Sequence, residues 1–402
     1  MNVLFLTLVK IKSLEDGGIF PDLLRKFRDE GHQVSIVSPT ERRDKLDTHL
    51  VKESGAQILH VKTLNIQKTG FLEKGIGTIA IDYQYLKAVK SYFSKQKFDL
   101  VLYSTPPITF SKVVEFIKKR DNAYSYLLLK DIFPQNAVDM AMIKKGSFIH
   151  KMFLKKERKL YEISDKIGCM SQANIDFVLK YNLELLPTKL EINPNSIEPK
   201  KRIITFGQKQ NIKIKYGLPL DKKIFAYGGN LGKPQGLDFL LKTISNNKNE
   251  DVFFLIIGFG TEYNKVKSYF DNKKPQNAKL LKVLPKNDYD TLLNACDVGL
   301  IFLHKNFTIP NFPGRLLSYL EMEMPIIAAT DINTDIGEVI VNNQCGYWVE
   351  SGDDVAMQDA ITNIINNEDM FEEMKNNSWK LLQKEFTVSR TYDLIKNKID
   401  NV

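Results

Sequence analysis

The chain has 402 residues, of which 43% are hydrophobic and 26% are charged, so a globular protein of two domains is expected rather than a disordered or fibrous one. Its three cysteines are widely spaced, which argues against a disulfide framework or a zinc site. No stretch of about 18 uncharged apolar residues is present, and the strand-like start predicts neither a signal peptide nor a membrane span. The formal charge of +9 favours an anionic ligand or surface.

The first half alternates short apolar runs with helical patterns. After the opening run at residues 2–9, apolar residues recur at helical spacing from Ile19 until Gly31 ends the pattern. Apolar runs separated by helices are typical of a parallel sheet that is covered on both faces. Further strands are predicted over residues 33–39, 58–61, 98–103, 124–129, 166–170 and 189–192.

The second half repeats this alternation, and a Pro- and Lys-rich break near Pro199 marks the domain boundary. We predict an α/β protein with two Rossmann-like domains, 1–198 and 199–385, that face each other across a cleft. Residues 386–402 are predicted to form a helix that crosses back to the first domain. Ligands in such sheets bind at the carboxyl ends of the strands. Strands of the second domain are predicted over residues 223–227, 252–257, 279–283, 298–302 and 325–329.

A dinucleotide-binding enzyme is the first functional hypothesis, and the glycine spacing argues against it. That site requires G-x-G-x-x-G directly after the first strand, whereas Gly17-Gly18 comes about eight residues later. The fragment Gly258-Phe259-Gly260 is equally typical of a tight strand-to-helix turn. The sequence also contains no G-x-x-x-x-G-K-[ST] phosphate-binding loop.

A more specific series of motifs runs through the second half. It consists of YGGNLGKPQG at 227–236, IIGFG at 256–260, LP at 284–285, ACDVGL at 295–300 and FPGRLLSYL at 312–320. The first half adds DGG at 16–18 and KDIFP at 130–134. In this order the chain resembles the retaining, nucleotide-sugar-dependent glycosyltransferases of the GT-B fold, family 4. It is most similar to the bacterial branch that makes capsule and O-antigen, which includes the N-acetylfucosamine transferases.

The physical chemistry of these motifs points to an anion site. The segment Pro313-Gly314-Arg315 opens a helix whose free N–H groups and positive dipole end attract phosphate, and Arg315 adds a charged donor. Gly229 leaves room for a pyrophosphate, and Lys233 lies in the same loop. Arg315 and Lys233 are each alternatively a solvated surface residue. The resemblance implies donor-diphosphate contacts from Gly229, Asn230, Lys233, Gln235, Gly314, Arg315 and Leu316, and nucleoside contacts from Gly258, Leu284, Pro285, Ser318 and Glu321.

The first domain supplies candidates for the acceptor side. Gly17 and Gly18 would let a loop approach the substrates closely, or would form a plain flexible turn. Asp131 follows a predicted strand and would bind a sugar hydroxyl or orient the acceptor, or would cap a helix. Gly18 and Asp131 are the candidate catalytic residues, and Gly17 belongs to the acceptor loop. Glu157 is expected to be a solvated helix residue.

The sequence departs from the family at several positions. The family's Arg and Lys that grip the donor phosphates align with Asn230 and Gln235, and its Glu-x7-Glu motif aligns with Pro310 and Ser318. Ser318 is expected to bond the ribose hydroxyls more weakly than a carboxylate would. Glu321, three residues further along the same helix, is the alternative.

The resemblance implies a retaining enzyme of the hexosyltransferase type in which the donor's own β-phosphate oxygen accepts the acceptor proton. The implied donor is a UDP-sugar, such as UDP-N-acetyl-L-fucosamine. The implied acceptor is a saccharide on undecaprenyl diphosphate in capsular or surface polysaccharide synthesis. No metal or other cofactor is expected. Two alternatives stay open: a catalytically silent GT-B partner subunit, and a UDP-sugar 2-epimerase.

The segment 143–160 predicts contact with an anionic membrane surface. Basic residues are interleaved with Phe148 and Met152 so that basic and apolar faces separate on a helix. We therefore expect a cytoplasmic protein bound peripherally to the inner face of the plasma membrane, and no nucleic-acid partner, since no such motif accompanies the charge. The alternative is a domain-surface helix with solvated lysines. The candidate membrane residues are Lys151, Lys155, Lys156 and Lys159.

Overall fold

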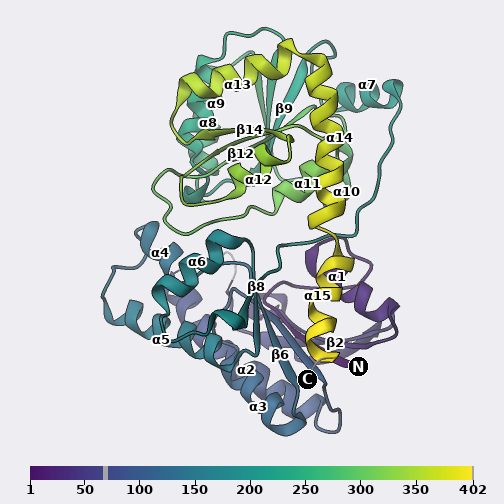
Figure 1. Ribbon diagram of the computed structural model, residues 1–402, viewed down its shortest axis with the longest axis vertical. Helices are drawn as coiled ribbons and strands as arrows, with labels where there is room; N and C mark the ends of the chain where they lie inside the picture. Colours follow the sequence, from purple (N-terminus) through teal and green to yellow (C-terminus); the bar gives the residue numbers. More distant parts are fainter. Residues whose placement is uncertain (67–70, 401–402) are drawn as a thin grey trace. The chain divides into compact units, whose positions relative to one another are not determined.

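The computed structural model describes residues 1–66 and 71–400, and the chain divides into two compact units. The first unit comprises Met1–Glu198 with Thr387–Val402, and the second comprises Pro199–Phe386. Each unit is a sheet with helices on both faces (Figure 1). The predicted first domain contains residues 67–70 and the predicted last helix contains Asn401 and Val402, all of which lie outside the described residues.

In the first unit the described residues form an eight-stranded sheet of order β3-β4-β2-β1-β5-β6-β7-β8. Its neighbouring strands run parallel except for β3, which pairs antiparallel with β4. The central strands are apolar because both faces are covered, and β5 is buried at every position. The strands are β1 (Asn2–Leu6), β2 (Gln33–Glu41), β3 (His49–Glu53), β4 (Ala56–Thr63), β5 (Leu100–Ser104), β6 (Tyr124–Leu129), β7 (Lys166–Cys169) and β8 (Leu190–Ile192).

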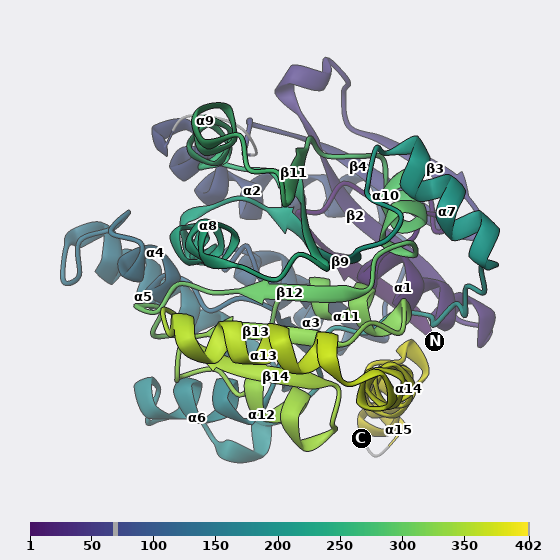
Figure 2. The ribbon, with the colours of Figure 1, turned by 90° about the horizontal axis from the view of Figure 1, so that it is seen from above.

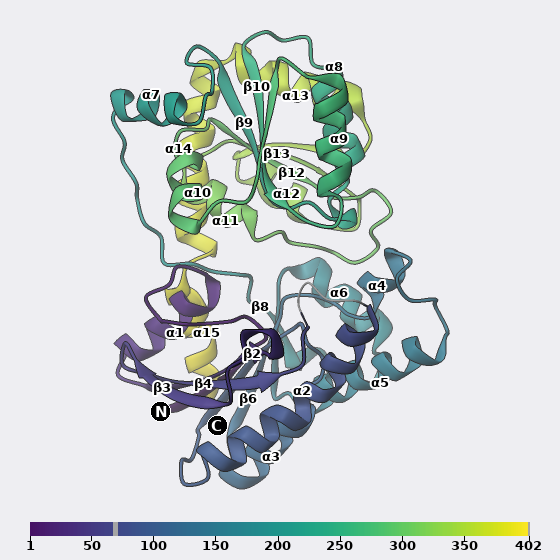
Figure 3. The ribbon, with the colours of Figure 1, turned by 180° about the vertical axis from the view of Figure 1, so that it is seen from behind.

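The helix that ends the chain packs in the first unit, as predicted. Helix α15 (Val388–Asp400) lies against α1 (Ile19–Asp29), and both contribute to one buried cluster with the sheet. The Tyr392 ring lies 4.9 Å from the Phe27 ring, and its hydroxyl bonds to His32 Nε2 at 2.9 Å. The other face carries α2, α3 and α5 side by side (Figure 3). The remaining helices of this unit are α2 (Phe71–Tyr92), α3 (Ser111–Asp121), α4 (Gln135–Asp139), α5 (Phe148–Ile163), α6 (Gln172–Tyr181) and the short turns η1 (Arg42–Asp44) and η2 (Pro187–Lys189).

In the second unit the described residues form a six-stranded, fully parallel sheet of order β11-β10-β9-β12-β13-β14 (Figure 2). Helices α8, α9 and α13 cover one face and share a buried cluster with it, while α10, α11 and α14 cover the other (Figures 1 and 3). The strands are β9 (Lys223–Asn230), β10 (Val252–Phe259), β11 (Ala278–Leu281), β12 (Val298–Phe302), β13 (Ile326–Thr330) and β14 (Gly346–Glu350). The helices are α7 (Phe206–Lys215), η3 (Lys233–Gln235), α8 (Leu237–Asn246), α9 (Tyr263–Lys273), α10 (Lys286–Leu293), α11 (Arg315–Glu321), α12 (Ile336–Asn342), α13 (Asp354–Asn366) and α14 (Glu368–Glu385).

Two strands differ from the sequence prediction, and both lie at a sheet edge. Strand β3 was not predicted, and its antiparallel pairing corrects the expectation of a parallel sheet throughout the first unit. Its residues are only partly buried and include charges, so the apolar pattern of a buried strand is missing. Strand β14 was missed for the same reason, because only Val349 of its residues is buried and the others are partly or fully exposed.

Candidate functional site

The candidate site of the second unit is built at the carboxyl ends of β9 and β10, where two glycines face each other. Gly258 of β10 is in register with Gly229 of β9, and a Cβ at Gly258 would overlap the Gly229 carbonyl oxygen. Gly229 is exposed and has a φ of 124°, which a glycine adopts without strain. A Cβ at Gly229 would lie 3.5 Å from Arg315 Nη2 and 3.9 Å from Arg315 Nε. The space beside Gly229 is therefore bordered by the edge of a guanidinium.

Arg315, the first residue of α11, is held against two neighbours. Its guanidinium carbon lies 4.2 Å from the centre of the Tyr227 ring, and Nη2 donates a hydrogen bond to Gln235 Oε1. Nη1 is buried and has no hydrogen-bond partner among the described residues. The atoms that border the exposed Gly229 are Nη2 and Nε, and a guanidinium edge at such a position is a suitable partner for an anionic ligand.

Gln235 lies beneath this site rather than facing open space. It ends the short turn η3 and is buried, and its Oε1 accepts from Arg315 and lies 3.4 Å from the Tyr227 hydroxyl. Gln235, which the sequence analysis assigned to the diphosphate, thus has its amide oxygen engaged by the protein. Lys233 of the same turn and Asn230 at the end of β9 are both exposed.

The start of α11 offers fewer free N–H groups than the sequence suggested. The helix has seven residues, and the N–H groups of Leu316 and Leu317 donate to the carbonyls of Pro313 and Gly314 at 3.1 and 3.2 Å. Both N–H groups are therefore engaged within the tight turn, and the predicted contact between Leu316 and the donor diphosphate stays a prediction. Gly314 has a φ of −61°, so its backbone does not require glycine.

Three tyrosines of the site carried no role in the sequence analysis. Tyr319 Oη accepts from the Gly228 N–H at 3.1 Å and lies 3.1 Å from the Ala226 carbonyl, which fixes the end of β9. Burial raises the pKa of Tyr319 to about 12, so it is neutral. A Cβ at Gly228 would overlap the Tyr289 ring, and Tyr227 lies under Arg315. The sequence places these tyrosines within or next to the motifs. Their contacts could not be predicted, because they join strands and helices that are far apart in the chain.

The predicted nucleoside-binding residues separate into two environments. Leu284 is partly buried and Pro285 is exposed, immediately before α10. Ser318 is partly buried on α11. Glu321 is buried and accepts from the Lys200 N–H at 3.1 Å, and desolvation raises its pKa. One of its oxygens therefore anchors the segment that enters the second unit.

In the first unit Asp131 lies in the turn after β6. Its Oδ2 accepts from Asn136 Nδ2 at 2.7 Å, and Thr105 Oγ1 donates to its carbonyl at 2.9 Å. The alternative that Asp131 caps a helix is wrong, because α4 begins after Pro134 and has no side-chain cap. The neighbouring Lys130 donates to the Asn193 carbonyl at 3.0 Å, and burial lowers its pKa to about 7.

The two glycines of the first-unit loop differ in surroundings. Gly18 precedes α1 with a φ of 150°, and its N–H donates to Asp22 Oδ1 at 3.3 Å. A Cβ at Gly17 would meet no atom within 4 Å. Only Gly18 therefore has a conformational reason to be glycine in this structure.

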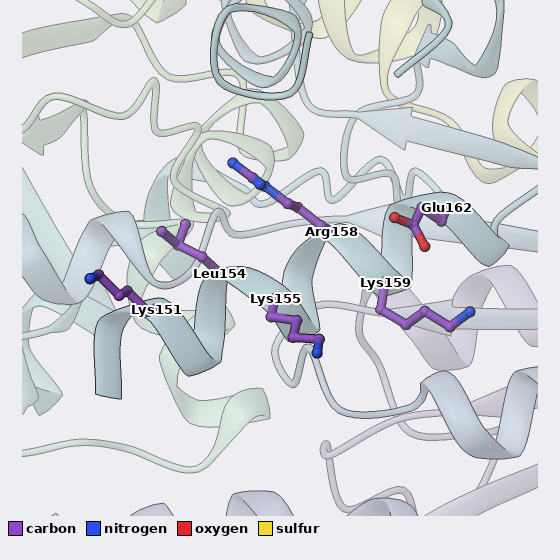
Figure 4. Close-up of a pocket in the computed structure, with 6 residues that line it drawn as sticks. All are labelled: Lys151, Leu154, Lys155, Arg158, Lys159 and Glu162. Carbon is purple, nitrogen blue, oxygen red and sulfur yellow. The ribbon is translucent and has the colours of Figure 1, made fainter. Parts of the chain in front are cut away.

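Helix α5 presents a basic outer surface and a packed inner one. Lys151, Leu154, Lys155, Arg158, Lys159 and Glu162 line a hollow of about 540 Å³ (Figure 4). All of them belong to this one helix, and Lys155 and Lys159 project on the same side. Lys159 pairs with Glu115 at 2.7 Å, and Lys156 is only partly exposed.

The buried stripe of α5 contains a charged residue that the sequence analysis placed in solvent. Phe153, Glu157 and Leu160 are buried, whereas Phe148 is 83% exposed. The expectation of a solvated Glu157 is wrong, because i, i+4 spacing puts it between the two apolar residues that face the protein. Tyr161 donates to Glu157 Oε1 at 2.9 Å, and burial raises the pKa of Glu157 to about 7.

The described residues show neither a cluster of metal-binding side chains nor a helix that could span a membrane. Among residues 1–66 and 71–400, no group of three or more His, Cys, Asp or Glu side chains could hold a metal ion. Within the same residues, no helix combines the length and apolar character needed to cross a bilayer.

The chain is similar to known glycosyltransferases in sequence and in structure. Residues 208–381 match the family described as "Glycosyl transferases group 1". The "Probable glycosyltransferase WbjE" of Pseudomonas aeruginosa is 23% identical over 303 residues, which cover 74% of this chain and 73% of that protein. The capsular polysaccharide biosynthesis glycosyltransferase CapM of Staphylococcus aureus is 24% identical over 169 residues, 42% of this chain and 43% of that protein.

Solved structures match the whole chain at low identity. The sucrose-phosphate synthase of Thermosynechococcus elongatus has a TM-score of 0.75 and 12% identity, covering 100% of this chain and 98% of that one. HepE of Anabaena, solved in complex with UDP, has a TM-score of 0.70 and 12% identity with full coverage of both chains. The chain is thus a glycosyltransferase with the two-domain α/β fold of GT-B structures, and its residues 208–381 match the model of the group 1 glycosyltransferase family.

Proposed function

We propose that this enzyme is a retaining glycosyltransferase that moves a sugar from a UDP-sugar to a lipid-linked saccharide acceptor in capsular or surface polysaccharide synthesis. The relative WbjE supports the glycosyltransferase activity, and CapM, a glycosyltransferase of capsular polysaccharide biosynthesis, supports the class of product. HepE supports the donor because it was solved with UDP. The observation that carries the donor site is the edge of Arg315 beside the exposed Gly229, within the family-matched segment.

The chemistry asked of this chain is electrostatic and positional. A diphosphate beside Gly229 would meet Nε and Nη2 of Arg315, which stabilise the negative charge that develops as the sugar leaves. Lys233, exposed in the adjoining turn, adds a second cation. In a retaining transfer the acceptor oxygen attacks the anomeric carbon, the bond to the diphosphate breaks, and the acceptor proton passes to a β-phosphate oxygen. This route needs no metal and no protein base.

On the acceptor side we assign roles to Gly17, Gly18 and Asp131. Asp131 carries an oxygen that accepts from Asn136, and this bond fixes the carboxylate for contact with a sugar hydroxyl. We further propose that the donor sugar is an N-acetylated amino deoxysugar such as N-acetyl-L-fucosamine, and that the acceptor lipid is undecaprenyl diphosphate. Peripheral contact with the inner face of the plasma membrane through α5 would bring the enzyme to such an acceptor.

The loss of the family's two carboxylates at Pro310 and Ser318 favours one second candidate, a GT-B partner subunit that binds a nucleotide but transfers nothing. A UDP-sugar 2-epimerase is the other alternative with this fold.

A donor screen separates these functions. The purified enzyme is incubated with each of several UDP-sugars, with and without a lipid-linked saccharide, and released UDP, extended lipid and isomerised sugar are measured. Transfer predicts UDP release with one donor only when acceptor is present, and a product with the donor's anomeric configuration. UDP binding without turnover for any donor would support the silent partner, and isomerised donor without acceptor would support the epimerase.

A further inference from the structure

We propose that Gln235 is a positioning residue that acts on the donor through Arg315, an inference that rests on the proposed donor site. The resemblance led us to expect Gln235 to touch the diphosphate in place of a lysine. The geometry instead gives the neutral amide the task of orienting the guanidinium.

The first step is the hydrogen bond itself. Arg315 Nη2 donates to Gln235 Oε1, and the same oxygen lies 3.4 Å from the Tyr227 hydroxyl. Gln235 is 8% exposed and Tyr227 is fully buried, so both partners are themselves fixed by packing. A hydrogen bond from a cation to a buried amide oxygen is directional, and it is stronger than a hydrogen bond between two neutral groups.

The second step is the orientation that this bond produces. The Tyr227 ring covers one face of the guanidinium at 4.2 Å, which restricts tilting but not rotation within the plane of the guanidinium. The bond to Gln235 removes that rotation. With both contacts in place, Nη2 and Nε border the open space beside Gly229.

The third step is charge. A lysine at position 235 would place a second cation against Arg315 in a partly buried setting, where repulsion between like charges is strong. A glutamate would form an ion pair that neutralises Arg315 toward a diphosphate. Only a neutral acceptor holds the guanidinium and leaves its charge for the ligand. In this chain Arg315 of α11 therefore supplies the positive charge, and Gln235 of η3 holds Arg315 in place.

The test is a double-mutant cycle read by UDP calorimetry. The variants are Gln235→Met, which keeps length and removes the acceptor, Arg315→Ala, and the double variant. Gln235→Met is expected to weaken UDP binding about three- to ten-fold in the presence of Arg315 and to have no effect in the Arg315→Ala background. Gln235→Glu is expected to weaken it further and to reduce the dependence of binding on salt.

The outcomes separate the positioning role from other roles. An equal loss on Gln235→Met in both backgrounds would show direct contact with the diphosphate, and no loss in either would overturn the proposal. If Arg315→Ala itself left UDP affinity unchanged, the donor-site assignment would fail instead. Thermal unfolding checks each variant, and Gln235→Asn, which keeps the amide but shortens its reach, replaces Gln235→Met if the latter does not fold.

Discussion

At the scale of single residues, the sequence identified chemical groups but not the contacts between them. Arg315 was expected at an anion site because it follows Pro313-Gly314, and the structure places it beside Gly229. That Gln235 and Tyr227 hold it could not be predicted, because these residues lie 80 and 88 positions away and their approach depends on how β9, η3 and α11 pack. Free N–H groups were expected at the start of α11, and they are fewer for a local reason, the tight turn in which the N–H groups of Leu316 and Leu317 are engaged.

Glu157 yields a prediction about pH. Its pKa in the folded protein, about 7, lies above the unfolded value near 4.3, so folding takes up a proton between these pH values. The contribution of Glu157 to the free energy of unfolding is therefore greatest below about pH 4.3 and is lost as the pH rises through 7. Glu157→Gln keeps an acceptor for Tyr161 without the charge, and we expect it to stabilise the protein by roughly 1–3 kcal/mol at pH 8 and by much less at pH 5.

Urea unfolding of the wild type and the variant at the two pH values measures this difference. Glu162→Gln, an exposed position on the same helix, is the matched control and should show no such change. A gain for Glu157→Gln that is the same at pH 5 and pH 8 would mean that the carboxyl is already ionised in the folded protein.

At the scale of elements, period and composition predicted the strands that are buried on both faces. The edge strands β3 and β14 escaped because partly exposed strands lack a continuous apolar run. Helix α5 was expected from its pattern, but the residues of its buried face were not identified. The sequence reading selected Phe148 and Met152 as the apolar side, whereas the structure buries Phe153, Glu157 and Leu160. Several periodic stripes fit one helix, and only packing selects among them.

This packing changes the form of the membrane prediction for α5. Since the apolar stripe is occupied by the first unit, binding should depend on exposed cations and on Phe148 in the first turn, without insertion of the helix face. Each basic residue near an anionic surface contributes about 1 kcal/mol. Lys151→Gln with Lys155→Gln should therefore weaken binding to anionic vesicles by about 2 kcal/mol, or roughly 30-fold.

Co-sedimentation with vesicles of anionic and of neutral lipid, at low and high salt, measures the effect. Exchange of two exposed lysines of α14, Lys380 and Lys384, for Gln is the control for a mere loss of net charge. Wild-type protein that stays in the supernatant with anionic vesicles at low salt would contradict the membrane prediction. An equal loss of vesicle binding in the α5 and α14 variants would mean that binding depends on the overall charge and not on α5.

At the scale of the whole molecule, alternation of strands and helices predicted two α/β units and the return of the last helix to the first unit. The return is fixed by specific contacts, such as the Tyr392 hydroxyl on His32, that have no signature in the sequence. The order of strands could not be read from the chain either, because a long crossover connection between parallel strands leaves the neighbour of each strand unspecified. It is this order that puts β9 beside both β10 and β12 and so brings the residues of the proposed donor site together at their carboxyl ends.

The central claim is that the second unit binds a nucleoside diphosphate through Arg315 at this edge, and calorimetric titration of UDP tests it most directly. Arg315→Ala should weaken UDP binding by about 1.5–3 kcal/mol, the contribution of a charged hydrogen bond. Lys223→Ala, which removes a cation at the opposite end of β9 where it pairs with Glu368, should leave the affinity unchanged. Equal UDP affinity in the wild type and Arg315→Ala, or equal losses in both variants, would contradict the assignment.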